Sequence, residues 1–282
     1  MAHRQYRPGP GDLSKDNAHR PDAAPPARVL FIGNSLTYGN NLPRMVQAIA
    51  ASQEAGPRIE TVTYAIPGAE LDTLWDEDHA AAALRAGDFD AVVLQERGGV
   101  LGCMAMNRRD PGCRRSERAH RRFAEIAAEH GARVLLFAAW PPMSSRDLND
   151  RHHRKAVKET TLRSYQVLAR LLGSDAAPVA VVPAVAALAD LAGSRDAPQV
   201  LDDDVHPTVV GSLTIAALLY DAITGRKLEP ADLTLDFPLL PANALVESDA
   251  PLESQPQLAG DRSRVLVKAE AVEPYFSLAN GY

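Results

Sequence analysis

The chain has 282 residues, of which 46% are hydrophobic, and its formal net charge is −6. Residues 229–282 hold nine acidic and three basic side chains, so the rest of the chain is close to neutral. A nearly neutral body with an acidic tail argues against bulk nucleic-acid binding, which needs a basic face. No run of the sequence approaches the roughly 18 uninterrupted apolar residues of a membrane-spanning helix.

The N-terminal residues 1–27 are polar and rich in proline, and they contain no apolar core of a secretory signal. We therefore expect a disordered leader and a cytoplasmic protein. Cys103 and Cys113 lie ten residues apart in a segment rich in glycine and arginine. Two free thiols are the simpler interpretation in a cytoplasmic protein, while a loop-closing disulfide stays open.

Short apolar runs alternate with helical patterns from residue 28 onwards. The expected strands span 28–33, 58–65, 89–96, 132–140 and 177–184. The expected helices span 42–52, 71–85, 116–130, 155–172 and 209–224. Runs of Val, Ile and Leu without strict alternation suit strands that are covered on both faces, and repeated strand–helix units require parallel crossovers.

This order predicts one doubly wound α/β domain over residues 28–226. Its five-stranded parallel sheet is expected to have a flavodoxin-like, three-layer α/β/α arrangement. Residues 227–282 form an acidic extension with several prolines and one strand-like run, 264–272. The sequence leaves open whether this extension is only partly ordered or crosses the core as a strap.

Polar residues stand at the carboxyl ends of the predicted strands, the edge at which open parallel sheets bind ligands. They are Asn34, Ser35, Gly68, Gln95, Glu96 and Trp140, and the loop 202–208 lies at the same edge. These separate segments are therefore expected to meet in one crevice.

Ser35 stands at a strand–helix junction, where serine or asparagine commonly caps the helix. The segment GNSLT lacks the glycine spacing and the Lys-Ser/Thr pair of a phosphate-binding loop. It also lacks the G-x-G-x-x-G pattern of a dinucleotide-binding turn. Taken alone, the serine favours a cap, with a nucleophile as the alternative.

The segment DDDVHPT brings a carboxylate and an imidazole together in one short turn. A nucleophilic serine needs a base within hydrogen-bond reach, and the base needs a carboxylate that fixes its tautomer. Asp203 and His206 have a suitable spacing. Favourable charge at a helix N-terminus is one alternative. A metal site completed by His152 and His153 is another, although the cations beside those histidines disfavour a dication.

Four segments in this order, FIGNSLT, IPGAEL, VVLQE and DDDVHPT, resemble those of the SGNH (GDSL-like) hydrolase family. The resemblance covers most of the predicted domain, and its first and last segments are the most specific. It implies a serine esterase with Ser35 as nucleophile, His206 as general base and then acid, and Asp203 as the orienting carboxylate. It implies no cofactor and no metal. Asp202 and Asp204 do not match the family spacing, and we interpret them as helix-entry charges.

The same resemblance implies that the backbone N–H groups of Ser35 and Gly68 bind an oxyanion. Most members place an asparagine of a Gly-x-Asn-Asp segment as a third donor, whereas this chain has LQERGG. Gln95 carries the same carboxamide on a longer stem and could be that donor, or it could simply bond a neighbouring loop. The residues expected to contact substrate are Asn34, Glu96, Arg97 and Trp140.

Residues 97–122 hold eight arginines and two acidic residues. This segment could hang over the crevice as a lid that binds an anionic group of a small-molecule ester. A solvated basic helix face is the favoured alternative. The low aromatic content, 5%, and the absence of a long apolar loop favour a short acyl group, such as acetyl on a sugar or small metabolite. An acyltransferase of the same fold and a non-catalytic scaffold protein stay open.

Overall fold

A parallel five-stranded sheet forms the centre of the computed structural model, which describes residues 26–54, 56–175, 177–260 and 264–282. The predicted leader thus lies almost entirely outside the described residues. None of the helices in these ranges combines the length and the apolar character that a membrane crossing requires. The strand order is β2-β1-β3-β4-β5, and every neighbouring pair is parallel. The strands are β1 (Ala27–Gly33), β2 (Ile59–Ala65), β3 (Ala91–Gln95), β4 (Arg133–Phe137) and β5 (Val179–Val182).

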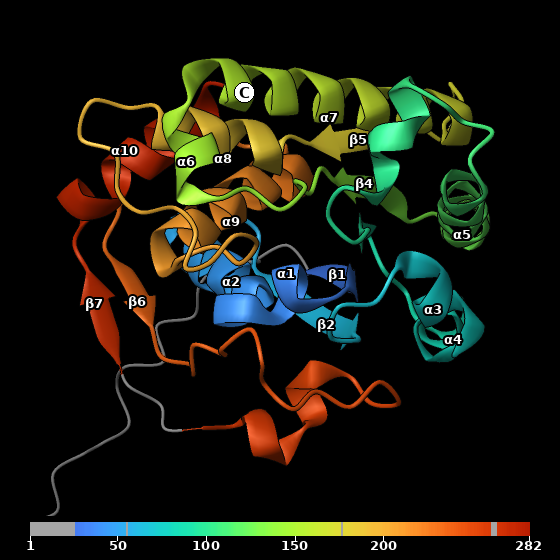
Figure 1. Cartoon of the computed structure of the whole chain (residues 1–282). Helices are drawn as coiled ribbons and strands as arrows, with labels where there is room; N and C mark the ends of the chain where they lie inside the picture. The colour runs from blue at the N-terminus through green and yellow to red at the C-terminus, as the bar shows by residue number, and fades with distance from the viewer. Residues whose placement is uncertain (1–25, 55, 176, 261–263) are drawn as a thin grey trace, which may run out of the picture.

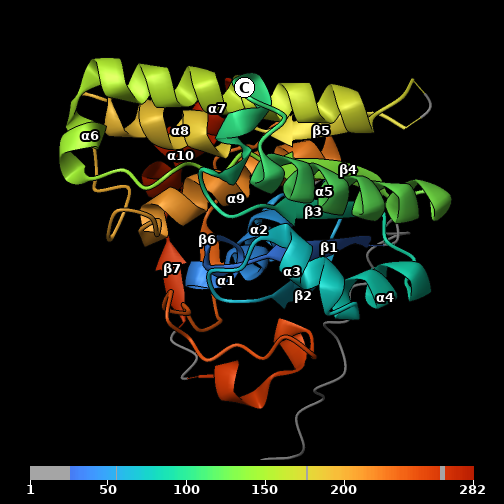
Figure 2. The same ribbon diagram turned by 45° about the vertical axis from the view of Figure 1, so that its right-hand side comes forward.

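Helices cover both faces of this sheet and make three layers, as Figures 1 and 2 show. One layer contains α2 (Leu42–Ser52) and α9 (Val209–Thr224), which pack on each other. The other layer contains α3 (Leu71–Asp76), α4 (His79–Ala86), α5 (Pro111–Glu129) and α7 (Arg151–Leu172). The central strand β3 is buried along its whole length, which explains its run of apolar residues without alternation. The predicted doubly wound α/β fold is confirmed.

The helix boundaries follow the predicted pattern closely in two places, Leu42–Ser52 and Val209–Thr224. The main helices are α1 (Ser35–Tyr38), α2 (Leu42–Ser52), α3 (Leu71–Asp76), α4 (His79–Ala86), α5 (Pro111–Glu129), α6 (Ser145–Asn149), α7 (Arg151–Leu172), α8 (Ala184–Ala192), α9 (Val209–Thr224) and α10 (Ala269–Asn280). Short 3₁₀ turns are η1 (Gly39–Asn41), η2 (Val100–Ala105), η3 (Leu252–Ser254) and η4 (Pro256–Leu258).

Three expectations about local structure are wrong. The helix expected over 71–85 is split into α3 and α4, because Asp78 takes a left-handed conformation with φ of 59°. The strand expected over 177–184 ends at Val182, and the unpredicted helix α8 begins two residues later. Helix α8 is buried on nearly all sides, so it lacks the one-sided apolar pattern by which helices are recognised.

The third departure lies in the C-terminal extension. Its strand-like run over 264–272 is a strand only at β7 (Val265–Val267), and the chain then enters α10. Strand β7 pairs with β6 (Leu233–Leu235) in an antiparallel two-stranded sheet. The extension wraps the side of the domain: β6 contacts α2, α10 packs on α9, and η3 lies beside β2 (Figure 1).

Glu253 of η3 covers the free edge of the sheet at its outer strand β2. Its carboxylate accepts hydrogen bonds from the backbone N–H of Thr63 at 2.9 Å and from the hydroxyls of Thr63 and Thr61 at 2.8 and 3.0 Å. Desolvation raises the pKa of Glu253, against the lowering effect of these bonds. An uncovered edge strand presents unpaired backbone groups, and this contact satisfies one of them, the N–H of Thr63.

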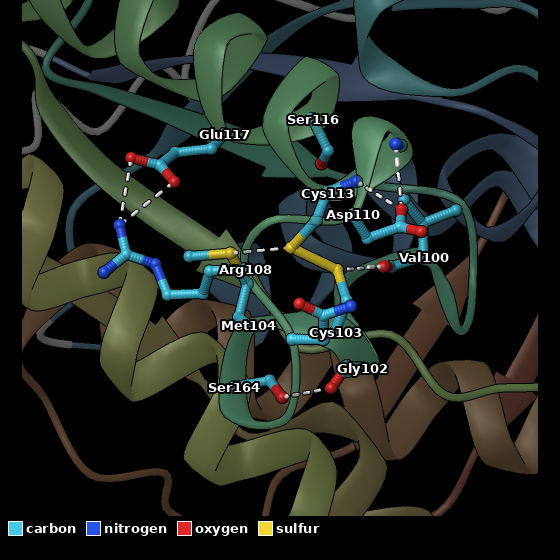
Figure 3. The surroundings of a disulfide bond; sticks show 12 residues. Val100, Gly102, Cys103, Met104, Arg108, Asp110, Cys113, Ser116, Glu117 and Ser164 are labelled. Carbon is cyan, nitrogen blue, oxygen red and sulfur yellow. Dashed lines mark hydrogen bonds and ion pairs between the residues drawn. A yellow bond between two sulfur atoms is a disulfide. The ribbon is translucent and has the colours of Figure 1, made fainter.

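Cys103 and Cys113 form a disulfide that joins η2 to the first turn of α5, as Figure 3 shows. The interpretation of two free thiols is therefore corrected. The intervening turn brings the two Cα atoms to 5.9 Å, and Asp110 caps α5 by accepting from the N–H groups of Gly112 and Cys113. The hydroxyl of Ser164 on α7 donates to the carbonyl of Gly102, which anchors η2 on its other side.

We predict that Glu253→Ala lowers the free energy of unfolding by about 1–3 kcal/mol, because it leaves buried donors of β2 without an acceptor. Thermal unfolding followed by circular dichroism measures the change. Ser254→Ala is the matched control, since that exposed side chain bonds only the carbonyl of Pro251. An equal loss of stability in both variants would contradict the edge-capping role.

Candidate active site

Ser35 begins helix α1 directly after β1, with Asn34 as the capping residue. The Asn34 side-chain oxygen accepts from the N–H of Leu36 at 3.1 Å. Gly33 must be glycine here, because a Cβ would lie 2.2 Å from the Thr37 hydroxyl and 2.5 Å from Oε1 of Gln95. The cap that the sequence suggested is therefore made by Asn34, which leaves the Ser35 side chain free for another role.

The structure brings Ser35, His206 and Asp203 into one hydrogen-bonded chain. Nε2 of His206 lies 2.9 Å from Oγ of Ser35, and Nδ1 lies 2.8 Å from Oδ2 of Asp203. Because an ionised carboxylate only accepts hydrogen bonds, Nδ1 carries the imidazole proton and Nε2 accepts from the serine hydroxyl. This order of donors is the one that a serine nucleophile and its base require.

Asp203 also organises the turn in which His206 lies. Its Oδ1 accepts from the backbone N–H groups of Val205 at 2.7 Å and His206 at 2.6 Å. Desolvation raises the pKa of Asp203, but the hydrogen bonds from the His206 side chain and from the two N–H groups outweigh it and lower the pKa to about 2. The carboxylate therefore stays charged at neutral pH, where it can stabilise an imidazolium.

The loop that holds His206 is fixed from the side by the segment that follows β4. The indole N–H of Trp140 donates to the carbonyl of Val205 at 2.9 Å, and the N–H of Met143 donates to the carbonyl of Asp204 at 2.7 Å. Trp140 is fully buried. Its indole N–H thus positions the loop that holds His206. From the sequence, the position of Trp140 at a strand end did not show whether it has this role or contacts substrate.

The expected oxyanion donors Ser35 and Gly68 lie on two loops that are tied together. The side-chain N–H of Asn34 donates to the carbonyl of Ala69 at 2.9 Å, and Gly68 has a φ of 69°, which favours glycine. Across the described ranges, the backbone N–H groups of Ser35 and Gly68 have no hydrogen-bond acceptor within the protein. Both are therefore free to bind a ligand.

Gln95 lies beneath this region, buried with its amide engaged by the protein. Its Oε1 accepts from the N–H of Asn34 at 2.8 Å and from the hydroxyl of Thr37 at 2.9 Å. Its Nε2 donates to the carbonyl of Glu96 at 2.6 Å. These contacts are the bonds to neighbouring loops of the alternative interpretation, and they use one of the two N–H donors of the amide. The role of a third oxyanion donor stays a prediction. The longer stem lets the amide reach under the loop that carries Ser35.

Glu96 is fully buried and joins the loops after β2 and β3. Its Oε1 accepts from the N–H groups of Leu71 and Arg97 at 3.0 and 2.8 Å, and its Oε2 accepts from the hydroxyl of Ser116 on α5 at 2.5 Å. Desolvation raises the pKa of Glu96 to about 7, although the three hydrogen bonds oppose it. No sequence pattern indicated Ser116, because it lies within a helix far from any motif.

The residues expected to contact substrate are thus mostly buried. Asn34, Glu96 and Trp140 are each 2% exposed or less, and their polar atoms hold loops in place. Contact of these three residues with substrate stays a prediction. Arg97 alone of the four has an exposed side chain, and it forms an ion pair with Glu70 at 2.5 Å.

The arginine-rich segment 97–122 is divided between η2, a turn and α5. Helix α5 packs on the sheet and on α3 and α4, as Figure 2 shows, so this part of the segment is not a lid over the crevice. Several arginines pair with acidic neighbours: Arg108 and Arg121 with Glu117, and Arg115 with Asp72. This arrangement matches the alternative of a solvated basic helix face.

The histidines of the metal alternative lie on α7. Asp150 accepts from the backbone N–H groups of His152 and His153, and so caps that helix. In the part of the chain that the structure describes, no group of three or more His, Cys, Asp or Glu side chains is arranged to hold a metal ion.

Comparisons with known proteins give a likeness in fold. No family model matches the chain, and no curated protein matches its sequence. A DUF4886 family protein from Bacteroides uniformis aligns with a TM-score of 0.56 and 14% identity, over 91% of this chain and 94% of that one. These values establish a shared fold at a sequence identity too low to assign a family.

Two smaller structures align with the larger part of the chain. A protein named as a GDSL-like lipase from Parabacteroides merdae has a TM-score of 0.51 and 15% identity, over 73% of this chain and 99% of that one. The acetylxylan esterase Axe2 from Geobacillus stearothermophilus has a TM-score of 0.50 and 18% identity, over 72% and 96%. The fold is therefore shared with proteins named as esterases and lipases.

The raised pKa of Glu96 makes stability depend on pH with a defined sign. The group titrates near pH 4.5 in the unfolded chain and near 7 in the folded one, so between these values only the folded state holds the proton. The free energy of unfolding contributed by Glu96 therefore falls as the pH rises through this window.

We predict that Glu96→Gln removes this decrease in the free energy of unfolding between pH 5 and pH 7. The unfolding free energy at pH 7 minus that at pH 5 should be more positive in the variant than in the wild type by roughly 2 kcal/mol. Urea unfolding at the two pH values measures it. His120, whose pKa burial lowers to about 4, adds an opposite dependence that is common to both proteins. Identical differences in the two proteins would contradict a protonated Glu96.

Proposed function

We propose that this protein is a serine esterase of the SGNH type, with Ser35 as nucleophile, His206 as base and Asp203 as its orienting carboxylate. The observation that carries the proposal is the continuous chain of hydrogen bonds from Asp203 through His206 to Ser35, at 2.8 and 2.9 Å. The fold shared with a protein named as a GDSL-like lipase and with acetylxylan esterases supports it.

The mechanism follows from this order of groups. Oγ of Ser35 attacks the ester carbonyl while Nε2 of His206 takes its proton, and the charged imidazolium is stabilised by Asp203. The tetrahedral oxyanion is bound by the free N–H groups of Ser35 and Gly68. His206 then protonates the leaving alcohol, and a water molecule activated by the same imidazole releases the acid from the acyl-enzyme.

The proposed substrate is a short acyl ester, with acetyl preferred. Helix α5 packs on the sheet face instead of covering the crevice, and only 5% of the residues are aromatic, which favours a short acyl chain over a long one. The neighbours named as acetylxylan esterases support an acetyl group on a carbohydrate or similar alcohol. Gln95 acts in this proposal by holding the loop of Ser35 from below.

We predict that Ser35→Ala lowers kcat for p-nitrophenyl acetate by at least about 10³-fold, because the covalent intermediate can no longer form. The wild type should hydrolyse the acetate faster than the butyrate and should gain one fluorophosphonate adduct on Ser35, seen by intact mass and peptide mapping. Equal activity of wild type and variant, with no adduct in either, would refute the nucleophile assignment.

We further predict that Asp203→Asn lowers kcat by roughly 10²- to 10⁴-fold, because the amide N–H faces Nδ1 and favours the wrong imidazole tautomer. The asparagine oxygen can still accept from the backbone of the turn, so the loop should keep its shape. Asp202→Asn and Asp204→Asn are matched controls on the same loop, and they should stay within about threefold of the wild type. Comparable losses in all three variants would mean that loop charge matters instead of the Asp203–His206 bond.

A further inference from the structure

Two consecutive asparagines separate the short helix of Ser35 from helix α2. Asn40 and Asn41 both lie in the left-handed region, with φ of 53° and 55°. Asparagine tolerates this conformation better than most residues. Such a backbone is unusual and occurs where the surrounding structure fixes it, so the contacts of these two residues indicate what the turn is for.

The Asn40 side chain crosses from the nucleophile segment to the histidine segment. Its Nδ2 donates to the carbonyl of Pro207 at 2.8 Å and to the hydroxyl of Ser212 in α9 at 3.0 Å. Pro207 directly follows His206, and Asn40 lies five residues after Ser35. One side chain thus links the segments that carry the nucleophile and the base, independently of the bond between those two groups.

Asn41 has a similar backbone but a different partner. Its Nδ2 donates to the carbonyl of Pro238 in the C-terminal extension at 3.1 Å, with no bond to the histidine segment among the described residues. Substituting each of the two neighbours in turn therefore separates the effect of the left-handed turn from the effect of the link to Pro207.

The C-terminal extension holds the same turn from the opposite side. The backbone N–H of Asn40 donates to the carbonyl of Leu240 at 2.7 Å, and the hydroxyl of buried Tyr38 donates to the carbonyl of Ala242 at 2.5 Å. Tyr38 and Leu240 also share a small apolar cluster with Leu252 and Leu258. Asn40 is thus fixed at its backbone by the extension while its side chain reaches the histidine loop.

We propose that Asn40 is a positioning residue that sets the separation of Ser35 and His206 by holding the Pro207 carbonyl. This inference rests on the proposed function. Without the link, the histidine loop would still be held by Trp140 and Met143 on its other side and by the packing of α9 on α2, but no side-chain hydrogen bond other than that of Ser35 with His206 would join it to the segment after β1 in the described residues. A displacement of about 1 Å at a reacting pair can cost about 10²-fold in rate.

The test compares Asn40→Gly with Asn41→Gly, because glycine keeps the left-handed backbone in both and removes one side chain each. For Asn40→Gly we expect kcat for p-nitrophenyl acetate to fall by about 10²-fold with KM within about twofold. Fluorophosphonate labelling of Ser35 should slow by a similar factor. Asn41→Gly should stay within about threefold of the wild type in both measurements, even if the two variants lose equal thermal stability.

A second variant, Asn40→Asp, keeps the shape and the backbone preference but replaces the donor to Pro207 by an acceptor. It should show the same loss of kcat, and folding is checked by its circular dichroism spectrum. Equal kcat values for the Asn40 and Asn41 variants, or a loss confined to KM, would overturn the positioning role. A wild type that neither hydrolyses the ester nor reacts with the fluorophosphonate would instead refute the proposed function.

Discussion

The hydrogen bond between His206 and Ser35 joins two segments that lie 171 residues apart in the chain. A bond of this kind works only if both loops are held to within a fraction of an ångström. Asn34 caps the helix of the serine, Trp140 holds the histidine loop from one side, and Asn40 links the two. Much of the polar structure at this edge of the sheet can be understood as support for that single contact.

Buried polar side chains beneath the crevice also hold these loops in place. Gln95 and Glu96 end the central strand β3, and their side chains bond backbone groups of the loops after β1, β2 and β3. Burial disfavours the charged form of Glu96 and so raises its pKa. Each of its two oxygens nevertheless accepts a hydrogen bond. The benefit is rigidity: a carboxylate between three donors fixes loops that would otherwise move separately.

The C-terminal extension serves the fold and the site together. Through Glu253 it covers the edge of β2, and through Leu240 and Ala242 it contacts the turn after the serine helix. At its far end, the side chain of Asn280 pairs with the backbone of Leu228, which closes the extension on itself. A segment that looks like an appendage in the sequence therefore shares hydrogen bonds and apolar contacts with the site.

The sequence by itself determined the sheet, the two layers of helices and the meeting of Ser35, Asp203 and His206 at one edge, because strand periodicity and parallel crossovers leave few other arrangements. Only the tertiary structure decided which polar residues face the crevice and which lie beneath it. Gln95, Glu96 and Trp140 stand at strand ends like Ser35, and residue type cannot tell a buried amide from an exposed one. Their direction depends on loops that distant segments of the chain hold in place.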